Sequence, residues 1–318
     1  MIPRGITEHP IDDEPGEQTH RNTPTDTSTT RHRVIVSARA RLAVNSSVVA
    51  RPETEPTAGT YRIDTGVAEL SHDTIAGGWM LTINGAESSH IHPDPSVLEF
   101  EYMRQMAALL EYLRDDDGPW RVLHLGAAAC ALPRYLAHRY PSARQVAVEI
   151  DAELARLARE WFDLPRAPLL RIRVGDAREV VTALTAQTRD VVIRDAFVDG
   201  RTPRHLITRE FIEQVQRVLA PDGLYLANCG DNRDLVLARG EVATVASVFA
   251  HVAVIADAAM LKGRRTGNVV LAASDRPIEA IPKLVRALLS DPQPAQMLTD
   301  RQAREFGSAA VRHDADER

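Results

Sequence analysis

The sequence has few cysteines. Its 318 residues include only two, Cys130 and Cys229, and neither lies in a Cys-x-x-Cys pair or in a cluster of cysteine and histidine. This scarcity excludes a disulfide framework and argues against a cysteine-based metal site. It is typical of proteins that work in a reducing compartment, so we expect a cytoplasmic location and no bound metal.

Long apolar segments are also missing. There is no run of about 18 apolar residues, so a membrane-spanning helix is not predicted. Residues 1–30 have no apolar core of the kind that a secretory signal needs. The formal net charge is −6, which argues against a surface that binds nucleic acid. We therefore expect neither a membrane nor a nucleic acid as a partner.

Composition along the chain predicts four segments. The first is rich in Pro, Thr, Asp and Glu, and cannot bury enough apolar area to become ordered. The second alternates strand formers with polar residues over 61–70 and 79–83, with turn signals at Gly77-Gly78 and Asn84-Gly85. The predicted segments are a disordered or weakly ordered tail (1–58), a small β-hairpin domain (59–95), a larger α/β domain (96–275) and a C-terminal helix with a polar tail (276–318).

Strands and helices alternate through the third segment, after a helix predicted at 97–113. Such alternation predicts a mostly parallel sheet with right-handed crossovers. No obvious helix joins the last two strands across 257–267, so we expect an antiparallel final pair. The predicted strands are 121–125, 145–150, 169–174, 189–194, 223–228, 252–256 and 268–273, and the helices between them are 131–140, 152–162, 177–185, 207–219 and 234–249. This is the pattern of class I S-adenosylmethionine-dependent enzymes, a Rossmann-like seven-stranded α/β sheet, here with a small N-terminal antiparallel β domain.

The first strand–helix–strand unit has the features of a nucleoside site. A short apolar strand runs into a turn of small residues that begins at Gly126, and the second strand ends on Glu149 and Asp151. Small residues let the backbone and the helix N-terminus approach a ligand, and a carboxylate at a strand end accepts hydrogen bonds from ribose hydroxyls. We therefore predict nucleoside contacts from Gly126 and Glu149. Asp151 could contribute to the same site or cap the helix that follows it.

Carboxylates also follow the next three strands. Asp176 follows the third strand, where it could bind the amine of adenine or cap a helix. Asp195 ends a buried apolar strand, where an unpaired carboxylate is costly, so we interpret it as a general base or substrate anchor. The alternative is a structural hydrogen bond to nearby loop amides. Asp231 closes the fifth strand, and we assign it to the substrate side of the site.

Motifs in their order along residues 59–275 resemble those of the spermidine synthases, the polyamine aminopropyltransferases. The resemblance is strongest to the divergent spermidine-synthase-like proteins of actinobacteria. The motifs are W-M-L-T-I-N-G, E-F-E-Y-M, V-L-H-L-G-A-A-A-C, V-E-I-D, G-D-A-R, V-V-I-R-D-A-F, L-A-P-D-G-L-Y-L-A-N-C-G-D and L-K-G-R-R-T-G-N-V-V-L.

The resemblance implies roles for individual residues. Glu149 matches the acid that binds ribose, and Asp176 and Ala177 match the pair that contacts adenine. Asp195 matches the proton acceptor, and Tyr102 matches a tyrosine that lines the aminopropyl and amine site.

The chain also departs from the family pattern. Ala129 replaces an acid that helps hold the donor's ammonium group, and Val198 replaces a second acid, with Asp199 one residue later. We include Asp199 among the substrate-binding candidates. Met103 and Arg104 replace a histidine and a glutamate. The site is therefore less acidic than the family norm, although each ammonium of a buried polyamine needs a carboxylate partner.

Three functions remain open from the sequence. The first is transfer of an aminopropyl group from decarboxylated S-adenosylmethionine to a polyamine acceptor such as putrescine, a small-molecule amine. The second is a methyltransferase that uses S-adenosylmethionine on the same scaffold, which the loss of the acid at Ala129 favours. The third is a non-catalytic protein that binds a nucleoside. The resemblance also suggests a homodimer.

Overall fold

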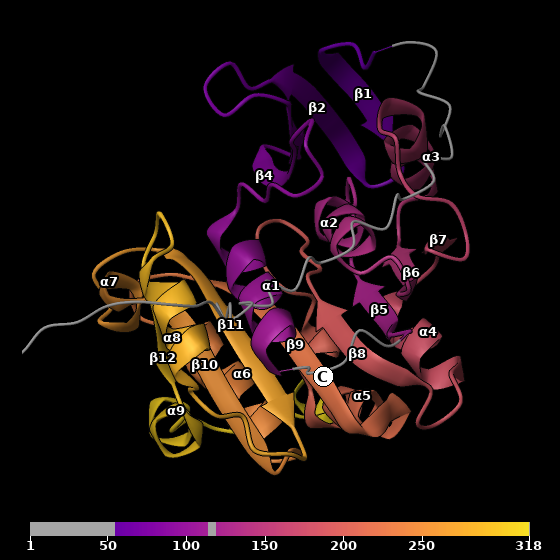
Figure 1. Ribbon diagram of the computed structural model, residues 1–318. Coiled ribbons are helices and arrows are strands. Elements are labelled where there is room, and N and C mark those ends of the chain that lie inside the picture. The colour runs from indigo at the N-terminus through magenta and orange to yellow at the C-terminus, as the bar shows by residue number, and fades with distance from the viewer. Residues whose placement is uncertain (1–54, 114–118, 318) are drawn as a thin grey trace, which may run out of the picture. The chain divides into compact units, whose positions relative to one another are not determined.

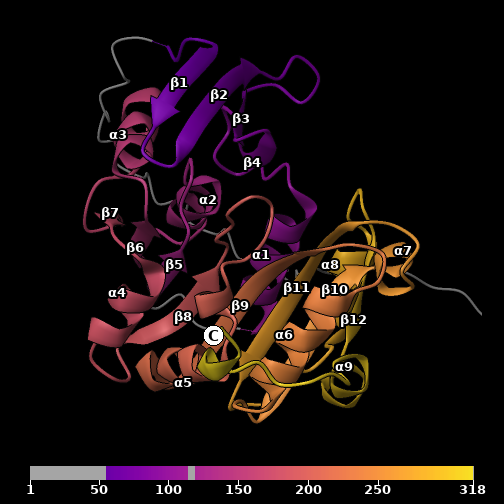
Figure 2. The same cartoon turned by 180° about the vertical axis from the view of Figure 1, so that it is seen from behind.

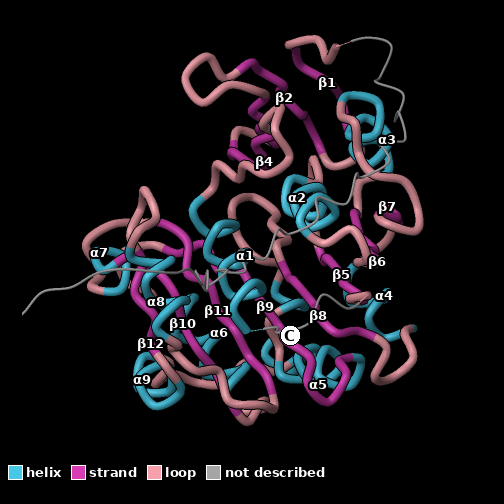
Figure 3. Tube along the Cα trace, viewed as in Figure 1, coloured by secondary structure: helices cyan, strands magenta, loops and turns pink. Residues whose placement is uncertain are grey.

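The computed structural model describes residues 55–113 and 119–317. Of the tail predicted over residues 1–58, residues 1–54 lie outside the described part of the chain. The remaining chain forms a small antiparallel sheet followed by a large mixed sheet with helices on both faces, as the ribbon in Figures 1 and 2 and the trace in Figure 3 show.

The small sheet contains four strands in sequential order, each antiparallel to its neighbour. Its strands are β1 (Gly59–Ile63), β2 (Gly66–His72), β3 (Trp79–Ile83) and β4 (Ala86–Ile91). The predicted turn at Asn84-Gly85 is present, with positive φ angles of 50° and 82°. The stretch predicted as one strand over 61–70 is two strands, because the chain turns back at residues 64 and 65.

The main sheet has eight strands, so the prediction of seven is wrong. The strand order is β12-β10-β11-β9-β8-β5-β6-β7. The strands are β5 (Arg121–Leu125), β6 (Arg144–Glu149), β7 (Leu170–Val174), β8 (Arg189–Arg194), β9 (Leu219–Asp231), β10 (His251–Asp257), β11 (Gly267–Ser274) and β12 (Ala295–Leu298). The eighth strand, β12, pairs antiparallel with β10 at the edge of the sheet. It has only four residues, too few for a periodic pattern.

The predicted antiparallel ending is confirmed. Strand β11 runs antiparallel to both β10 and β9, while β5 to β9 are parallel to one another. The loop between β10 and β11 contains the short helix α7 (Ala258–Leu261), which was not predicted. Because the chain leaves β5 toward β6 on one side and later returns to β8 on the other, β5 and β8 form the topological switch point. Ligands of open α/β sheets bind at this point.

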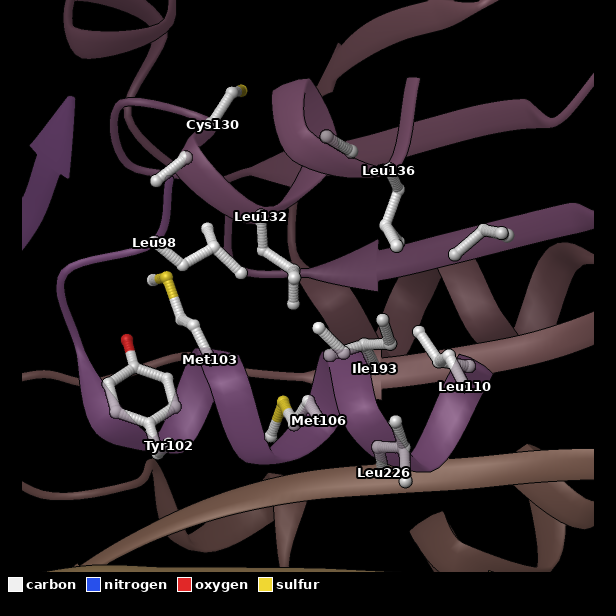
Figure 4. Close-up of a cluster of buried hydrophobic side chains, with 14 of the residues drawn as sticks. Leu98, Tyr102, Met103, Met106, Leu110, Cys130, Leu132, Leu136, Ile193 and Leu226 are labelled. Atoms are coloured by element: carbon white, nitrogen blue, oxygen red, sulfur yellow. The ribbon is translucent and has the colours of Figure 1, made fainter. Parts of the chain in front are cut away.

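Helices cover both faces of the main sheet. One face is covered by α1 (Glu101–Leu113), α2 (Ala131–Arg139), α3 (Ala152–Trp161) and α8 (Pro282–Leu289), whose buried side chains share one apolar cluster. The other face is covered by α4 (Ala177–Ala183), α5 (Arg209–Val218), α6 (Val236–Ala246) and α9 (Asp300–Phe306), which share a second cluster. In the first cluster, Figure 4 shows Met103 beside Leu98 and Leu132.

The C-terminal segment is more ordered than the helix and polar tail expected over 276–318. It contributes α8, β12, α9 and a short 3-10 helix, Asp314–Glu317. Asp314 forms an ion pair with Arg178 on α4, and the His313 ring lies 3.0 Å from the Glu210 carboxylate. These polar contacts attach the end of the segment to α4 and α5, while Leu284 and Leu288 of α8 pack into the first apolar cluster.

The small sheet is attached to α3 by hydrogen bonds. The backbone N–H and the hydroxyl of Thr65 both donate to Asp151, at 2.6 and 2.7 Å. Asp151 also accepts from the backbone N–H of Leu154 and thereby caps α3. Asp64 accepts from two further amides at the start of the same helix. One helix N-terminus therefore holds the turn between β1 and β2.

Replacement of Asp151 by alanine should lower the free energy of unfolding by about 1–3 kcal/mol, because a helix cap and two donors lose their acceptor. Burial alone would raise the pKa of Asp151, but hydrogen bonds from Leu154 and Thr65 lower it overall. The stabilisation is therefore complete above the unfolded pKa, about 4, and is lost as pH falls through the lower folded-state value. Urea unfolding of both proteins at neutral and acidic pH measures the difference.

The matched control is Asp222→Ala, which removes an exposed carboxylate paired with exposed Arg276. Such pairs contribute about 0–1 kcal/mol, so this variant should unfold close to the wild type. An equal loss of stability in the two variants would contradict the role given to Asp151.

Candidate functional site

Gly126 ends β5 at the centre of the sheet and closely approaches the next central strand. Its φ is +95°, and a Cβ atom there would lie 2.1 Å from the backbone oxygen of Asp195. Its N–H donates to the carbonyl oxygen of Val148, while Asp195 N–H donates to that of Leu125. Only glycine fits this position without displacing the backbone. The turn predicted for a nucleoside therefore lies directly against Asp195.

Asp195 is held between two side chains from different elements. The Tyr102 hydroxyl, on α1, donates to Oδ2 at 2.9 Å, and the Asn228 amide, on β9, donates to Oδ1 at 3.0 Å. Burial raises the pKa of Asp195 above its usual value, and these two hydrogen bonds oppose the rise. Burial and the Asp195 carboxylate both raise the pKa of Tyr102, so the phenol stays protonated and donates. The structure brings the two predicted residues together as one hydrogen-bonded group.

The sequence analysis did not single out Asn228. A signal was available, because Arg194 on β8 pairs with Ala227 on β9 and the next residues are Asp195 and Asn228. Strand register in a parallel sheet, once the strand order is known, places these two side chains beside each other. The order of the strands was the missing information.

Glu149 lies at the carboxyl end of β6 and is 8% exposed. One carboxylate oxygen accepts from the backbone N–H groups of Ala127 and Ala128, at 3.2 and 2.9 Å, and the other accepts from Asp151 N–H at 3.1 Å. Burial raises the pKa of Glu149, and the three amides act against that rise. Glu149 therefore lies beside the turn that follows Gly126, as predicted, and its carboxylate holds the backbone of that turn.

Asp176 caps α4 and also contacts a histidine. One oxygen accepts from the backbone N–H groups of Arg178 and Glu179, and the other lies 3.0 Å from Nε2 of His205. Burial opposes ionisation of Asp176, but the Glu179 amide and His205 lower its pKa overall. Ala177 begins α4 and is buried. His205 was not a predicted site residue, since its partner is 29 residues away in the sequence.

Three predicted acids lie apart from the Asp195 group. Asp151 is buried, and its carboxylate accepts hydrogen bonds from the first turn of α3 and from Thr65. Asp199 is exposed, in a turn with Gly200 that is closed by a bridge between residues 198 and 201. Asp231 accepts from the backbone N–H groups of Asn232 and Ala238, at 2.7 Å each, beside α6. Side chains alternate along β9, so Asp231 projects from the face opposite to Asn228.

The departures from the family pattern have structural explanations. Ala129 is fully buried, and its N–H donates to the hydroxyl of Ser89. Arg104 forms a bidentate ion pair with Asp291, at 2.7 and 2.9 Å. Glu101 accepts from the Asn268 amide on β11, next to the Tyr102 group. A carboxylate thus remains beside Tyr102, although the family acids at Ala129 and Arg104 are missing.

Apolar side chains are exposed along the carboxyl edge of the sheet. Ile150, directly after Glu149, is 57% exposed, and Val174 at the end of β7 is 51% exposed. Phe197 and Val198 are exposed after β8. Large apolar residues are thus exposed after three strands at the carboxyl edge of the sheet.

The cysteines are not placed as nucleophiles. Burial and the nearby Glu149 carboxylate raise the pKa of Cys130 to about 12, and burial likewise raises the pKa of Cys229. Within residues 55–113 and 119–317, no three His, Cys, Asp or Glu side chains are arranged to hold a metal ion. None of the helices in those two ranges has the length and apolar character needed to cross a bilayer.

The fold and the edge of the sheet define a Rossmann-like α/β protein with a carboxylate group at its switch point. No family model matches the chain. A crystal structure of a probable spermidine synthase from Corynebacterium glutamicum is 48% identical, with a TM-score of 0.77, and covers 81% of this chain and 97% of its own. The chain therefore belongs to the spermidine-synthase-like family.

Relatives of lower sequence identity include two kinds of enzyme, polyamine aminopropyltransferases and methyltransferases. A polyamine aminopropyltransferase from Vibrio vulnificus is 31% identical over 159 residues, which are 49% of this chain and 52% of that protein. An eEF1A lysine and N-terminal methyltransferase from Mus musculus is 28% identical over 164 residues, which are 46% of this chain and 23% of that protein. The chain thus spans about half the length of the aminopropyltransferase, and less of the methyltransferase.

Tyr102→Phe should raise the pKa of Asp195 further, because the ionised carboxylate loses a hydrogen bond while its burial remains. A titration of the labelled side-chain carboxyl carbon by NMR measures the pKa directly. Tyr61→Phe is the control, since that hydroxyl donates to the Thr57 carbonyl in the small sheet. An unchanged or lower pKa in Tyr102→Phe would show that the phenol does not stabilise the ionised form.

Proposed function

We propose that this protein is an aminopropyltransferase that moves an aminopropyl group from decarboxylated S-adenosylmethionine to a small-molecule amine. The observation that carries the proposal is the Asp195 carboxylate, held by Tyr102 and Asn228 beside the Gly126 turn. Membership of the spermidine-synthase-like family supports the reaction class. We propose putrescine or a related polyamine as the acceptor.

The donor's nucleoside would bind along the carboxyl edge of β5, β6 and β7. Glu149 would exchange its amide partners at residues 127 and 128 for the ribose hydroxyls. Asp176 and Ala177 would contact the adenine edge, while Ile150 and Val174 would cover its face. Covering exposed apolar side chains with an aromatic ring releases water and favours binding. Asp151 has a structural role as a cap, and its contribution to the donor would be indirect.

The reaction needs an unprotonated amine. A free alkylamine has a pKa of about 10.4, so deprotonation at pH 7 costs about 4–5 kcal/mol. The amine nitrogen attacks the carbon bonded to the positively charged sulfur, the carbon–sulfur bond breaks, and methylthioadenosine leaves with the electron pair. Asp195 accepts the proton that the nitrogen loses, and its raised pKa makes it a stronger base than an exposed carboxylate.

The acceptor would approach from the side of Tyr102 and Glu101. Glu101 supplies one carboxylate for an ammonium group, and Asp199 could supply another from residues 197–206 if this loop covers the site. Asp231 belongs to a strand that borders the substrate side, but its carboxylate already accepts a hydrogen bond from the backbone of α6. Its contribution to substrate binding would therefore be indirect. A homodimer and a cytoplasmic location are part of the same proposal.

A methyltransferase that uses S-adenosylmethionine is the second candidate. The observation in its favour is Ala129, which is buried where the family has an acid for the donor's ammonium group. Without that acid, the pocket repels the carboxylate group of S-adenosylmethionine less strongly. The match to a methyltransferase over 46% of this chain agrees with this candidate.

Thermal shifts with four nucleosides separate the candidates. We expect decarboxylated S-adenosylmethionine and methylthioadenosine to raise the melting temperature, because a ligand that binds only the folded state stabilises it. Stabilisation by S-adenosylmethionine and S-adenosylhomocysteine alone would support the methyltransferase. If none of the four compounds changes the melting temperature, the protein does not bind either donor, and both candidates are refuted.

Asp195→Asn should bind the donor as the wild type does but lose about 10²–10⁴-fold in turnover, because the amine has no proton acceptor. The rate of methylthioadenosine release with putrescine measures turnover, and calorimetry measures donor binding. Asp222→Asn, on the exposed surface, should retain the wild-type rate. Unchanged turnover in Asp195→Asn would remove this residue as the base.

A further inference from the structure

A cavity of about 320 Å³ lies away from the group around Asp195. Residues from the loop after β8, from α6 and from the C-terminal segment line it. The lining residues are Arg201, Thr202, Arg204, Ile207, Thr208, Gly230, Leu237, Glu241, Arg312, His313 and Asp316. Neither Asp195 nor any of its hydrogen-bond partners is among them.

The cavity lies behind β8 as seen from the Asp195 group. Arg194 and Asp195 are adjacent, so their side chains leave opposite faces of the strand. Arg194 is fully buried and reaches Glu241 on α6 and the hydroxyl of Thr202, both of which line the cavity. A ligand there would therefore be separated from Asp195 by the sheet itself.

Arg312 lines the cavity, and part of its guanidinium has no hydrogen-bond partner among the described residues. Its Nη2 donates to the carbonyl oxygens of Val236 and Leu237, at 3.4 and 3.1 Å. Its Nη1 is buried and has no hydrogen-bond acceptor among the described residues. A Cβ atom on Gly240 would lie 2.5 Å from Nη2, so glycine at this position makes room for the guanidinium. The guanidinium is therefore incompletely paired, and an anion in the cavity that Arg312 lines would give it a further acceptor.

The charges in the cavity favour an anion. Three arginines line it, and neither Arg201 nor Arg204 forms an ion pair with a described residue. Of the two lining acids, Glu241 is neutralised by Arg194, and the Asp316 carboxylate accepts from the backbone N–H of His313. Planar guanidinium groups match the paired oxygens of phosphate and carboxylate.

We propose that this cavity binds the oxyanion group, phosphate or carboxylate, of a small molecule through Arg312, Arg201 and Arg204. The volume is sufficient for a small organic anion. Because Arg201 and Arg204 belong to the loop region after β8 and Arg312 to the C-terminal segment, the anion would join two parts of the chain that otherwise meet through few polar contacts.

Calorimetric titration with inorganic phosphate and with citrate tests the proposal and distinguishes the two kinds of oxyanion. Both titrations are made at constant ionic strength set with sodium chloride, because general screening affects every surface charge. We expect saturable binding of at least one anion by the full chain. Arg312→Met should weaken it tenfold or more, because a charged donor is lost while most of the side-chain volume remains.

Two further variants make the result specific. Arg201→Gln should also weaken binding, and its exposed side chain makes loss of folding a minor concern. Arg286→Gln is the matched control, because that exposed arginine is on α8, which covers the opposite face of the sheet. The proposal is overturned if neither anion binds beyond the salt control, or if Arg312→Met and Arg201→Gln bind as tightly as the control variant.

Discussion

The close approach of Gly126 to the backbone of Asp195 is the constraint on which the site depends. It brings the end of β5 and the end of β8 so near that no side chain fits between them. The turn that would hold a nucleoside and the carboxylate that would accept a proton are therefore fixed to each other through backbone alone. Tyr102 and Asn228 then fix the direction of the carboxylate from two other elements. Backbone contact therefore sets the position of the carboxylate, and two hydrogen-bonded side chains set its direction.

The sequence predicted the parts of this arrangement that local patterns encode. Apolar runs predicted the seven strands β5 to β11, and the small residues after Gly126 predicted the turn. Strand β12 was missed because four residues in a polar context carry no period. Asn228 was missed because it meets Asp195 only once β8 and β9 are placed side by side. His205 was missed because it reaches Asp176 from the short 3-10 helix Arg204–Leu206 after β8. Contacts between side chains on neighbouring strands can be predicted only when the order of the strands in the sheet is known.

The acids at the strand ends show why position alone does not establish function. Asp151, Asp176 and Asp231 all accept hydrogen bonds from backbone amides near the start of the helix that follows, an interaction that any strand-to-helix turn favours. Asp195 is different, because its partners are the side chains of Tyr102 and Asn228. Asp195 is only partly exposed and caps no helix, so the usual structural role of a strand-end acid does not account for it. This distinction, rather than the number of acids, supports Asp195 as the proposed proton acceptor.

Strand β8 places one charge on each side of the sheet. Asp195 faces α1, whereas Arg194 reaches Glu241 and Thr202 on the other face. Burying an arginine in a central strand is unfavourable unless its hydrogen bonds are satisfied, and here they tie α6 to the loop that follows β8. That loop carries Phe197, which lies against Gly230 beyond Asn228. Hydrogen bonds on one face of β8 thus hold the same loop that carries Phe197 near the Asp195 group on the other face.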